Sequence, residues 1–347
     1  MKKKKLLFGI LAVLIFIIAF VASKFYGPAV STPAGEFFYI KTGSSYNDVK
    51  NELVAKKYIN GSYWFDWTSK MIGYKKIKPG RYKLKKGMNL ISLVRKLRSG
   101  DQALINFVIT KIRTKETLAS KLGNLFECDS TAIIQFLNSP DSLRPFGLDT
   151  NTAMVAAMPY TYPINWNTTP GKIFRQFHTS YKNFWTDERK QKAADHNLSP
   201  IEASILASII DEETNKQTDR PNIASVYLNR IRLGMPLQAD PTVKFGMRNF
   251  GLKRILNIHL KTVSPYNTYL NKGLPPGPIC TPQTTTIDAV LNSPKTDYVY
   301  FVASSNFDGS HIFTSDYDDH LKYARLYQKE LTKQMKIRDS IQKANAK

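Results

Sequence analysis

The feature that most constrains this chain of 347 residues is an apolar run close to its N-terminus. The run extends from Leu6 to Ala22 without a charge or a proline, and it follows a basic cluster, Lys2 to Lys5. A helix of this length spans roughly 25 Å, which is enough for one membrane crossing. Positive charges before the run predict a cytoplasmic N-terminus and an exported body after Lys24.

The same run could instead belong to a signal peptide that is removed, since Val21, Ala22 and Ser23 offer small residues near a cleavage point. Retention is favoured because the run exceeds the ~7–15 apolar residues typical of a signal peptide. We therefore expect residues 1–23 to form a cytoplasmic stub and a single-pass anchor in the inner (cytoplasmic) membrane, with the catalytic part on the periplasmic or extracytoplasmic side. Nucleic acid is not an expected partner of an exported body.

Composition narrows the remaining classes of protein. Hydrophobic residues make up 42% and charged residues 22%, which excludes wholesale disorder and a collagen-like fibre. Lys and Arg number 50 against 27 acidic residues, and the resulting net charge of +23 favours a polyanionic neighbour such as anionic lipid or an acidic wall polymer. The two cysteines form no CxxC pair and the five histidines no HExxH-like cluster, so neither a metal site nor a cofactor is expected.

The exported part divides into four predicted segments. Residues 24–35 contain two prolines and two glycines and are typical of a linker. Strand-then-helix patterns recur over 36–125 and predict one or two small α+β modules, which either grip an extended polymer or act as a spacer. Residues 126–198 predict a helical connecting region, and residues 199–347 predict a catalytic domain that ends in a charged helix.

A strong helix start precedes the most informative stretch of the chain. Ser199 at the N-cap, Pro200 at the first helical position and Glu202 three residues after the cap form a capping box. A second predicted helix, from about residue 219 to Leu233, is expected to pack on the first, with Gly234 as its stop.

Helical phase distinguishes the acidic residues at the end of the first helix. Its apolar stripe runs through Leu206, Ile209 and Ile210, and continuing it by three or four residues reaches Glu213. Asp211 and Glu212 fall about 100° to either side of that stripe. A carboxyl group that ends an apolar face is desolvated, which raises its pKa and suits it to act as a general acid near neutral pH. From periodicity alone, a simply solvated last turn remains open as the alternative.

Downstream, three loops are rich in Pro, Gly and polar residues, and loops of this kind commonly shape a site. The chain contains a series of motifs in one order: Ala207 to Thr214, Asp219-Arg220, Asn229-Arg230, Leu233 to Val243, Tyr266 to Tyr269, Gly273 to Gly277, Tyr298 to Ala303 and the late His311. This series resembles the endolytic murein transglycosylases (MltG/YceG-like), and with the N-terminal anchor the resemblance covers nearly the whole chain.

The resemblance implies an α+β fold with a single N-terminal membrane helix, small LysM-like α+β modules and a mixed α/β catalytic domain. It also implies that Glu213, immediately before Thr214, is the catalytic glutamate, which agrees with the helical phase. The candidates that the resemblance suggests for holding the sugars and the peptide stem of the substrate are Gln238, Asp240, Tyr266, Asn267 and Thr268.

Three positions depart from the family pattern. Asp211 replaces a Glu, Tyr160 replaces the Asp of a Pro-Asp-Thr-Tyr element, and Thr110-Lys-Ile-Arg113 replaces a Glu-Gly turn. The last two precede the predicted catalytic domain, so we expect them to affect substrate grip more than chemistry.

The implied activity is endolytic cleavage of the MurNAc–GlcNAc bond of nascent glycan strands, which leaves 1,6-anhydro-MurNAc ends and terminates elongation. The implied partners are peptidoglycan glycan strands, the membrane and peptidoglycan synthases. Three alternatives remain: a hydrolase (muramidase) with Asp240 or Asp211 as a second carboxylate, a non-catalytic wall-binding anchor, and a binder of anionic lipid or nucleic acid with steep salt dependence.

Overall fold

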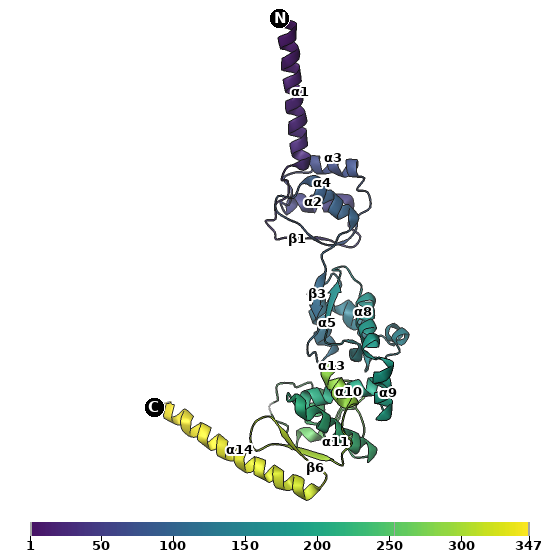
Figure 1. The fold of residues 1–347 in the computed structure, drawn as a ribbon, viewed down its shortest axis with the longest axis vertical. Coiled ribbons are helices and arrows are strands. Elements are labelled where there is room, and N and C mark those ends of the chain that lie inside the picture. Colours follow the sequence, from purple (N-terminus) through teal and green to yellow (C-terminus); the bar gives the residue numbers. More distant parts are fainter. Residues whose placement is uncertain (1, 253, 346–347) are drawn as a thin grey trace. The chain divides into compact units, whose positions relative to one another are not determined.

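The computed structural model describes residues 2–252 and 254–345, which form a mixed α+β chain divided into two compact units (Figure 1). Unit 1 consists of Met1–Phe107, Leu122–Asp129 and Pro163–Thr169, and unit 2 consists of Val108–Lys121, Ser130–Tyr162 and Pro170–Lys347. The α+β class and the N-terminal apolar helix are confirmed as predicted.

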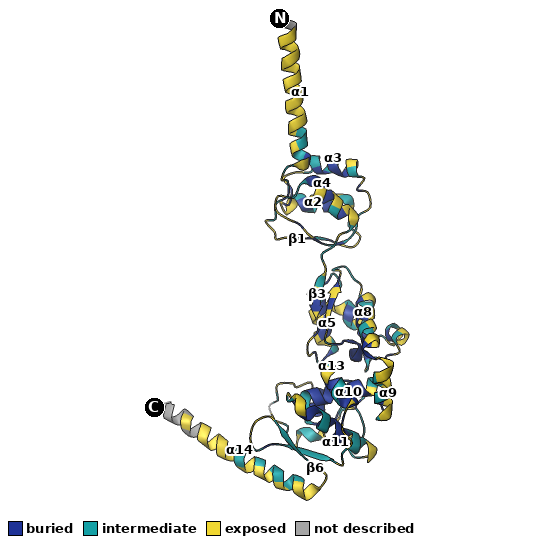
Figure 2. Cartoon of the chain, in the orientation of Figure 1, coloured by how far each residue is buried: buried dark blue, intermediate teal, exposed yellow. Residues whose placement is uncertain are grey.

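The apolar helix is α1 (Lys2–Tyr26). Among the described residues it is the one helix long and apolar enough to cross a membrane, over Lys4–Tyr26. Figure 2 shows it exposed along most of its length. Phe25, in its last turn, is buried against the rest of unit 1.

The remainder of unit 1 is a small α+β body. Its elements are β1 (Phe37–Ile40), α2 (Tyr46–Ala55), α3 (Tyr63–Ile72), β2 (Gly80–Lys83) and α4 (Leu90–Ser99). β1 and β2 pair antiparallel, with Phe37 opposite Lys83 and Ile40 opposite Gly80. β1 is followed by α2, which begins at a capping box formed by Ser45 and Asp48, so this body opens with the strand-then-helix order that the sequence predicts over 36–125. The core is built from side chains of all five elements, including Phe38, Leu53, Phe65, Tyr82 and Leu93.

The segment 24–35, predicted as a linker, is bound to this body. The Val30 amide donates to the Met88 carbonyl (3.0 Å), and the Ser31 amide donates to the Tyr58 carbonyl (2.9 Å). The Val30 side chain belongs to the core.

The middle of the chain is mostly helical. Its elements are β3 (Ile105–Val108), α5 (Lys115–Gly123), α6 (Ser130–Leu137), α7 (Pro140–Leu143), β4 (Thr161–Ile164), α8 (Pro170–Phe184) and α9 (Asp187–Asp195), with 3₁₀ turns at Arg144–Phe146 and Ala153–Ala156. β3 and β4 form a two-stranded sheet.

The C-terminal part of unit 2 surrounds one helix, α10 (Pro200–Glu213). The other elements are α11 (Arg220–Arg232), α12 (Asp240–Gly246), α13 (Thr284–Leu291), β5 (Tyr300–Ala303), β6 (His311–Thr314) and α14 (Tyr317–Asn345), with 3₁₀ turns at Gln217–Asp219 and His259–Lys261. The capping box of Ser199 and Glu202 begins α10 as predicted. β5 and β6 pair antiparallel, with Tyr300 opposite Thr314 and Ala303 opposite His311.

α10 is buried on more faces than one apolar stripe predicts. Every residue from Ala203 to Asp211 is buried, because α11, α12 and α13 all pack against it (Figure 2). The small residues Ala203, Ser204, Ala207 and Ser208 allow this close packing, and the two serine hydroxyls donate back to α10 carbonyls. The helix is therefore a rigid central support whose last turn carries the acidic residues.

Candidate active site

The last turn of α10 presents three acidic residues in three different environments. Asp211 is completely buried and pairs with Arg220 (Oδ1–Nη2, 3.2 Å). Its carboxylate also accepts hydrogen bonds from the Thr286 hydroxyl (2.6 Å) and the Gln283 amide. These partners make Asp211 a structural group that fixes α11 and α13 to the end of α10.

Glu212 is held by two basic side chains from the segment before α5. Arg113 donates to both of its oxygens, Nε to Oε1 at 3.1 Å and Nη2 to Oε2 at 2.8 Å. Lys111 lies 3.4 Å from Oε1 and also donates to the Asp211 carbonyl (2.6 Å). The segment Thr110–Arg113, which departs from the family pattern, therefore supports the end of α10. From the sequence we expected this segment to affect substrate grip more than chemistry.

Glu213 has a different set of neighbours. No salt bridge within 4.0 Å involves Glu213 among the residues that the structure describes, and its Oε1 accepts a hydrogen bond from the Tyr227 hydroxyl (2.7 Å). Burial raises the pKa of Glu213 to about 7, the Tyr227 hydrogen bond and the Lys244 charge oppose that rise, and the Asp240 charge adds to it. Glu213 is therefore a carboxyl group that can both hold and release a proton near neutral pH.

Tyr227, on α11, is the hydrogen-bond partner of Glu213. The side chain projects from α11 and is fully buried, which raises the pKa of its phenol well above 10 and keeps it protonated. The neutral phenol donates its hydrogen to the carboxylate form of Glu213 and so favours that form.

Glu213 opens onto a cavity of about 610 Å³. The cavity is bounded by the residues after α10, by the β5–β6 hairpin and by the start of α14, and its lining is Glu213, Thr214, Asn215, Lys216, Ala303, Ser304, Phe307, Asp308, Gly309, Ser310, His311 and Tyr327. Lys216 and Asp308 form an ion pair across this lining (2.9 Å). The volume is sufficient for a sugar ring beside the carboxyl group.

His311 is a cavity residue to which the sequence assigned no role. Its Nδ1 lies 2.9 Å from Oδ2 of Asp219, and the same oxygen accepts the His311 amide (2.7 Å). Because a carboxylate only accepts, Nδ1 carries the hydrogen and the ring orientation is fixed. The sequence signal was present in the motif order, but residues 219 and 311 are too far apart in the chain for their pairing to be inferred.

The five residues suggested as substrate contacts lie in different surroundings, and not all of them are near Glu213. Asp240 begins α12, accepts from the Tyr269 hydroxyl (2.6 Å) and is electrostatically coupled to Glu213. Gln238 is exposed, with a left-handed backbone (φ 55°), and its side-chain oxygen accepts from Arg230 (3.3 Å). The structure therefore brings Asp240 into the surroundings of Glu213 and leaves Gln238 on the preceding turn.

Asn267 and Thr268 are buried, with relative exposures of 0% and 1%. The Asn267 amide donates to the carbonyls of Leu260 (2.9 Å) and Thr262 (2.8 Å). The Thr268 hydroxyl accepts from the Ala239 amide (3.0 Å). In this structure both side chains shape the loops around α12.

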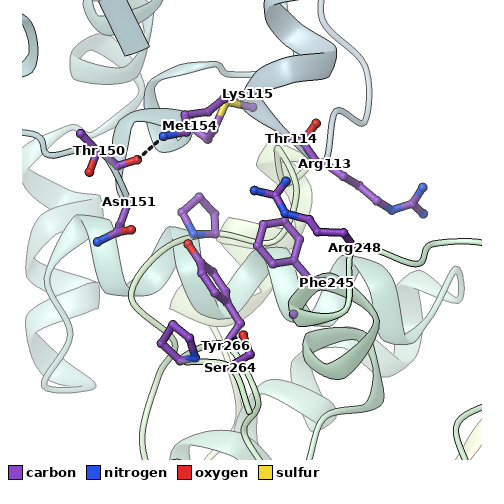
Figure 3. Close-up of a pocket in the computed structure, with 13 residues that line it drawn as sticks. Arg113, Thr114, Lys115, Thr150, Asn151, Met154, Phe245, Arg248, Ser264 and Tyr266 are labelled. Atoms are coloured by element: carbon purple, nitrogen blue, oxygen red, sulfur yellow. Dashed lines mark hydrogen bonds between the residues drawn. The ribbon is translucent and has the colours of Figure 1, made fainter. Parts of the chain in front are cut away.

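Tyr266 lies in a second cavity, of about 260 Å³, which Figure 3 shows in close-up. Its ring packs on Phe245 with 4.6 Å between centroids. Lys115 donates to the Thr150 carbonyl at 3.0 Å on the facing wall, and the Arg248 side chain extends toward the centre of the view. A smaller hollow lined by Glu212 and Lys244 shares Phe245 with this cavity.

No group of three or more His, Cys, Asp or Glu side chains in residues 2–252 and 254–345 is arranged to hold a metal ion. The fold and site thus define an α+β protein with one acid–base candidate at the end of a buried helix.

The chain belongs to the YceG-like family, whose model matches residues 38–326. A protein of Bacillus subtilis (strain 168) named endolytic murein transglycosylase is 31% identical over 309 residues, which cover 83% of each chain. A protein of the same name from Streptococcus pneumoniae serotype 2 is 26% identical over 81% of this chain, and the match spans 56% of that relative's length. The crystal structure of a putative YceG-like protein from Listeria monocytogenes superposes with a TM-score of 0.55 at 25% identity, covering 83% of this chain and 98% of that one.

Proposed function

We propose that this protein is a membrane-anchored lytic transglycosylase that cleaves peptidoglycan glycan strands endolytically. The observation that carries the proposal is the state of Glu213: of the three acids that end α10, it is the one without an ion-pair partner among the described residues, and it opens onto the 610 Å³ cavity. The name shared by the Bacillus and Streptococcus relatives supports the same reaction.

The chemistry needs one group that first gives and then takes a proton. Glu213 donates its proton to the glycosidic oxygen while the bond between that oxygen and C1 of the N-acetylmuramoyl ring breaks. The C6 hydroxyl oxygen of the same ring then bonds to C1, and its proton passes to the Glu213 carboxylate. The products are a free 4-hydroxyl on the leaving sugar and a 1,6-anhydro end, no water is consumed, and the acid is regenerated.

A pKa of about 7 suits Glu213 to both halves of this cycle. Tyr227 steadies the carboxylate after the first transfer, and the coupled charges of Asp240 and Lys244 oppose each other in setting the pKa. Because the nucleophile is tethered to the reacting ring, a second carboxylate is not required.

For substrate binding, we assign contact roles to Gln238, Asp240 and Tyr266, and loop-shaping roles to Asn267 and Thr268, whose side chains lack exposed surface. The anchor is α1, with the units on the extracytoplasmic side. The α+β body of unit 1 is proposed to be LysM-like, and peptidoglycan synthases are proposed partners because both would act on nascent strands. We also propose that the linker ends at residue 35, the α+β modules at residue 125 and the helical connecting region at residue 198.

Hydrolysis is the second candidate, and one observation favours Asp240 over Asp211 as its second carboxylate. Asp211 is fully engaged by Arg220 and two hydrogen-bond donors, whereas Asp240 is close enough to Glu213 to raise its pKa. In such a hydrolase Asp240 would activate water.

The deciding experiment is digestion of nascent, uncrosslinked glycan with the full-length protein, followed by mass analysis of the fragments. The proposal expects 1,6-anhydro ends, which are lighter by one water than reducing ends. Reducing ends would establish the hydrolase, and intact glycan with retained wall binding would establish a non-catalytic anchor. The matched control is Glu213→Gln, which should leave the glycan uncut in either catalytic case.

A further inference from the structure

Helix α3 in unit 1 carries three large exposed side chains at intervals of four residues. Tyr63, Trp67 and Met71 are 64%, 57% and 60% exposed. Four residues rotate a helix by about 400°, so successive members differ by about 40° and all three share one face. The opposite face is buried through Phe65. We refer to Tyr63, Trp67 and Met71 as the α3 face.

The α3 helix lies at the end of the apolar helix α1. The Phe25 ring, in the last turn of α1, meets the Trp64 ring edge-on with 5.5 Å between centroids. Figure 1 shows α3 running across the end of α1. Tyr26, next in the chain, is 72% exposed. Exposed aromatic side chains of α1 and α3, Tyr26 and Tyr63, therefore lie next to the Phe25–Trp64 contact that joins the two helices.

No slack separates the apolar run from the body of unit 1. The run ends at Ala22, and Phe25, three residues later, is already buried in the unit. At 1.5 Å per residue, this distance along the helix is only about 5 Å. The chain after α1 is fixed as well, because Val30 is buried and its amide bonds the Met88 carbonyl. If α1 crosses a bilayer, the body of unit 1 must lie directly on that bilayer's surface.

The chemistry of the α3 face matches that location. Tyr and Trp prefer the headgroup level of a membrane, where the ring is partly desolvated and its polar group stays wet. Lys70, in the last turn of α3, and Lys24, in the last turn of α1 with its ammonium group 4.9 Å from the centre of the Phe20 ring, add positive charge to these two helices. Such charges are attracted to anionic headgroups.

We propose that the α3 face is a membrane-contact surface that rests in the headgroup region of the bilayer that α1 crosses. The proposal rests on the proposed anchor but not on the catalytic activity. Its occupant is lipid, because the face is continuous with the membrane helix itself and combines aromatic, apolar and basic side chains. A second copy of this chain or another protein seated on α3 would shield the face from lipid.

The test uses the full chain reconstituted into phosphatidylcholine–phosphatidylglycerol vesicles, with or without phosphatidylcholine brominated on its acyl chains near the headgroup. One variant keeps Trp67 as its single tryptophan, through Trp64→Phe, Trp166→Phe and Trp185→Phe. The matched control keeps Trp166, which lies in the same unit and contacts Tyr39 of β1. Figure 1 shows β1 on the side of the body away from α1.

Brominated lipid should lower Trp67 emission by about twofold and leave Trp166 emission unchanged, since only a ring at headgroup level reaches the quencher. In the otherwise unaltered chain, Trp67→Phe should remove most of the quenchable emission, which guards against misfolding of the multiple variant. Protein that floats with the vesicles while Trp67 stays unquenched would overturn the α3 contact and leave the anchor standing. Protein that does not float would overturn both, whatever its glycan-cleaving activity.

Discussion

At the scale of single residues, Glu213 differs from its acidic neighbours in what its carboxylate meets. Asp211 and Glu212 each form an ion pair with a guanidinium group, whereas Glu213 meets a phenol and opens onto a cavity. The carboxyl oxygens of Asp211 and Glu212 are occupied by their ion pairs, whereas burial raises the pKa of Glu213 and its side chain opens onto the cavity, so Glu213 is the acid candidate.

Substituting Glu213 by Gln should therefore lower kcat by about 10²–10⁴-fold with little change in KM, because the amide keeps the size of the side chain but cannot deliver a proton. Glu212→Gln is the matched control and should change kcat by less than about threefold, since it weakens the partly exposed ion pairs with Arg113 and Lys111 and leaves Glu213 unchanged. Steady-state cleavage of uncrosslinked glycan measures both. If Glu212→Gln lost activity while Glu213→Gln kept a normal kcat, Glu212 rather than Glu213 would be the catalytic acid.

The pH dependence is a second residue-scale prediction. With a single group acting first as an acid, kcat/KM should fall as pH rises through the Glu213 pKa of about 7. The hydrogen bond from Tyr227 favours the carboxylate and lowers the pKa of Glu213, and Tyr227→Phe removes that bond. The variant's pKa should be higher, and its alkaline limb should move to higher pH. A limb displaced to lower pH in the pH–rate profile would contradict this assignment.

At the scale of elements, the sequence predicts where α10 begins and ends, but it does not predict which other helices and side chains pack against it. The Ser199 capping box and the stripe ending at Glu213 are interactions between neighbours in the chain, so the sequence predicted them correctly. Asp211 pairs with Arg220, and Glu212 pairs with Arg113, which lies 99 residues earlier in the chain. No local sequence pattern predicts such pairings. The resemblance suggested Asn267 as a substrate contact, and its side-chain contacts with the Leu260 and Thr262 carbonyls likewise could not be read from the local sequence.

The Gly273–Gly277 loop gives an element-scale prediction. A Cβ on Gly277 would lie 2.1 Å from the Asn151 carbonyl oxygen and 3.1 Å from the Tyr266 hydroxyl. Since the nearer contact is backbone, it cannot yield by a side-chain rotation, and Gly277→Ala should cost roughly 1–3 kcal/mol of unfolding free energy.

The matched control is Gly251→Ala in the same unit, where the nearest atom to a new Cβ is Asn249 Oδ1 at 3.8 Å. Thermal unfolding of the two variants tests the difference. Equal melting temperatures would mean that the loop moves freely past residue 151 and does not fix the wall of the Tyr266 cavity.

At the scale of the whole molecule, the +23 charge and the apolar N-terminus act together. Charge alone fits nucleic acid as well as lipid or wall polymer, and the Leu6–Ala22 run is what selects the extracytoplasmic alternatives. The family match begins at residue 38 and does not include α1, so the evidence for an anchor is the length and apolar composition of α1 itself.

The length and apolar composition of α1 predict that the mature protein keeps this helix. The helix continues without interruption from the apolar run to Phe25, which is buried in unit 1, so cleavage after Ala22 would leave a frayed stub in place of the last turn. Retention of about 17 apolar residues is also energetically sufficient for stable insertion. Sequencing the N-terminus of membrane-extracted protein should recover a peptide that starts within the first residues of the chain, and the protein should stay with membranes after an alkaline wash. A mature N-terminus at or after Ala22, with the protein released into the soluble fraction, would identify the run as a signal peptide and remove the membrane from the list of partners.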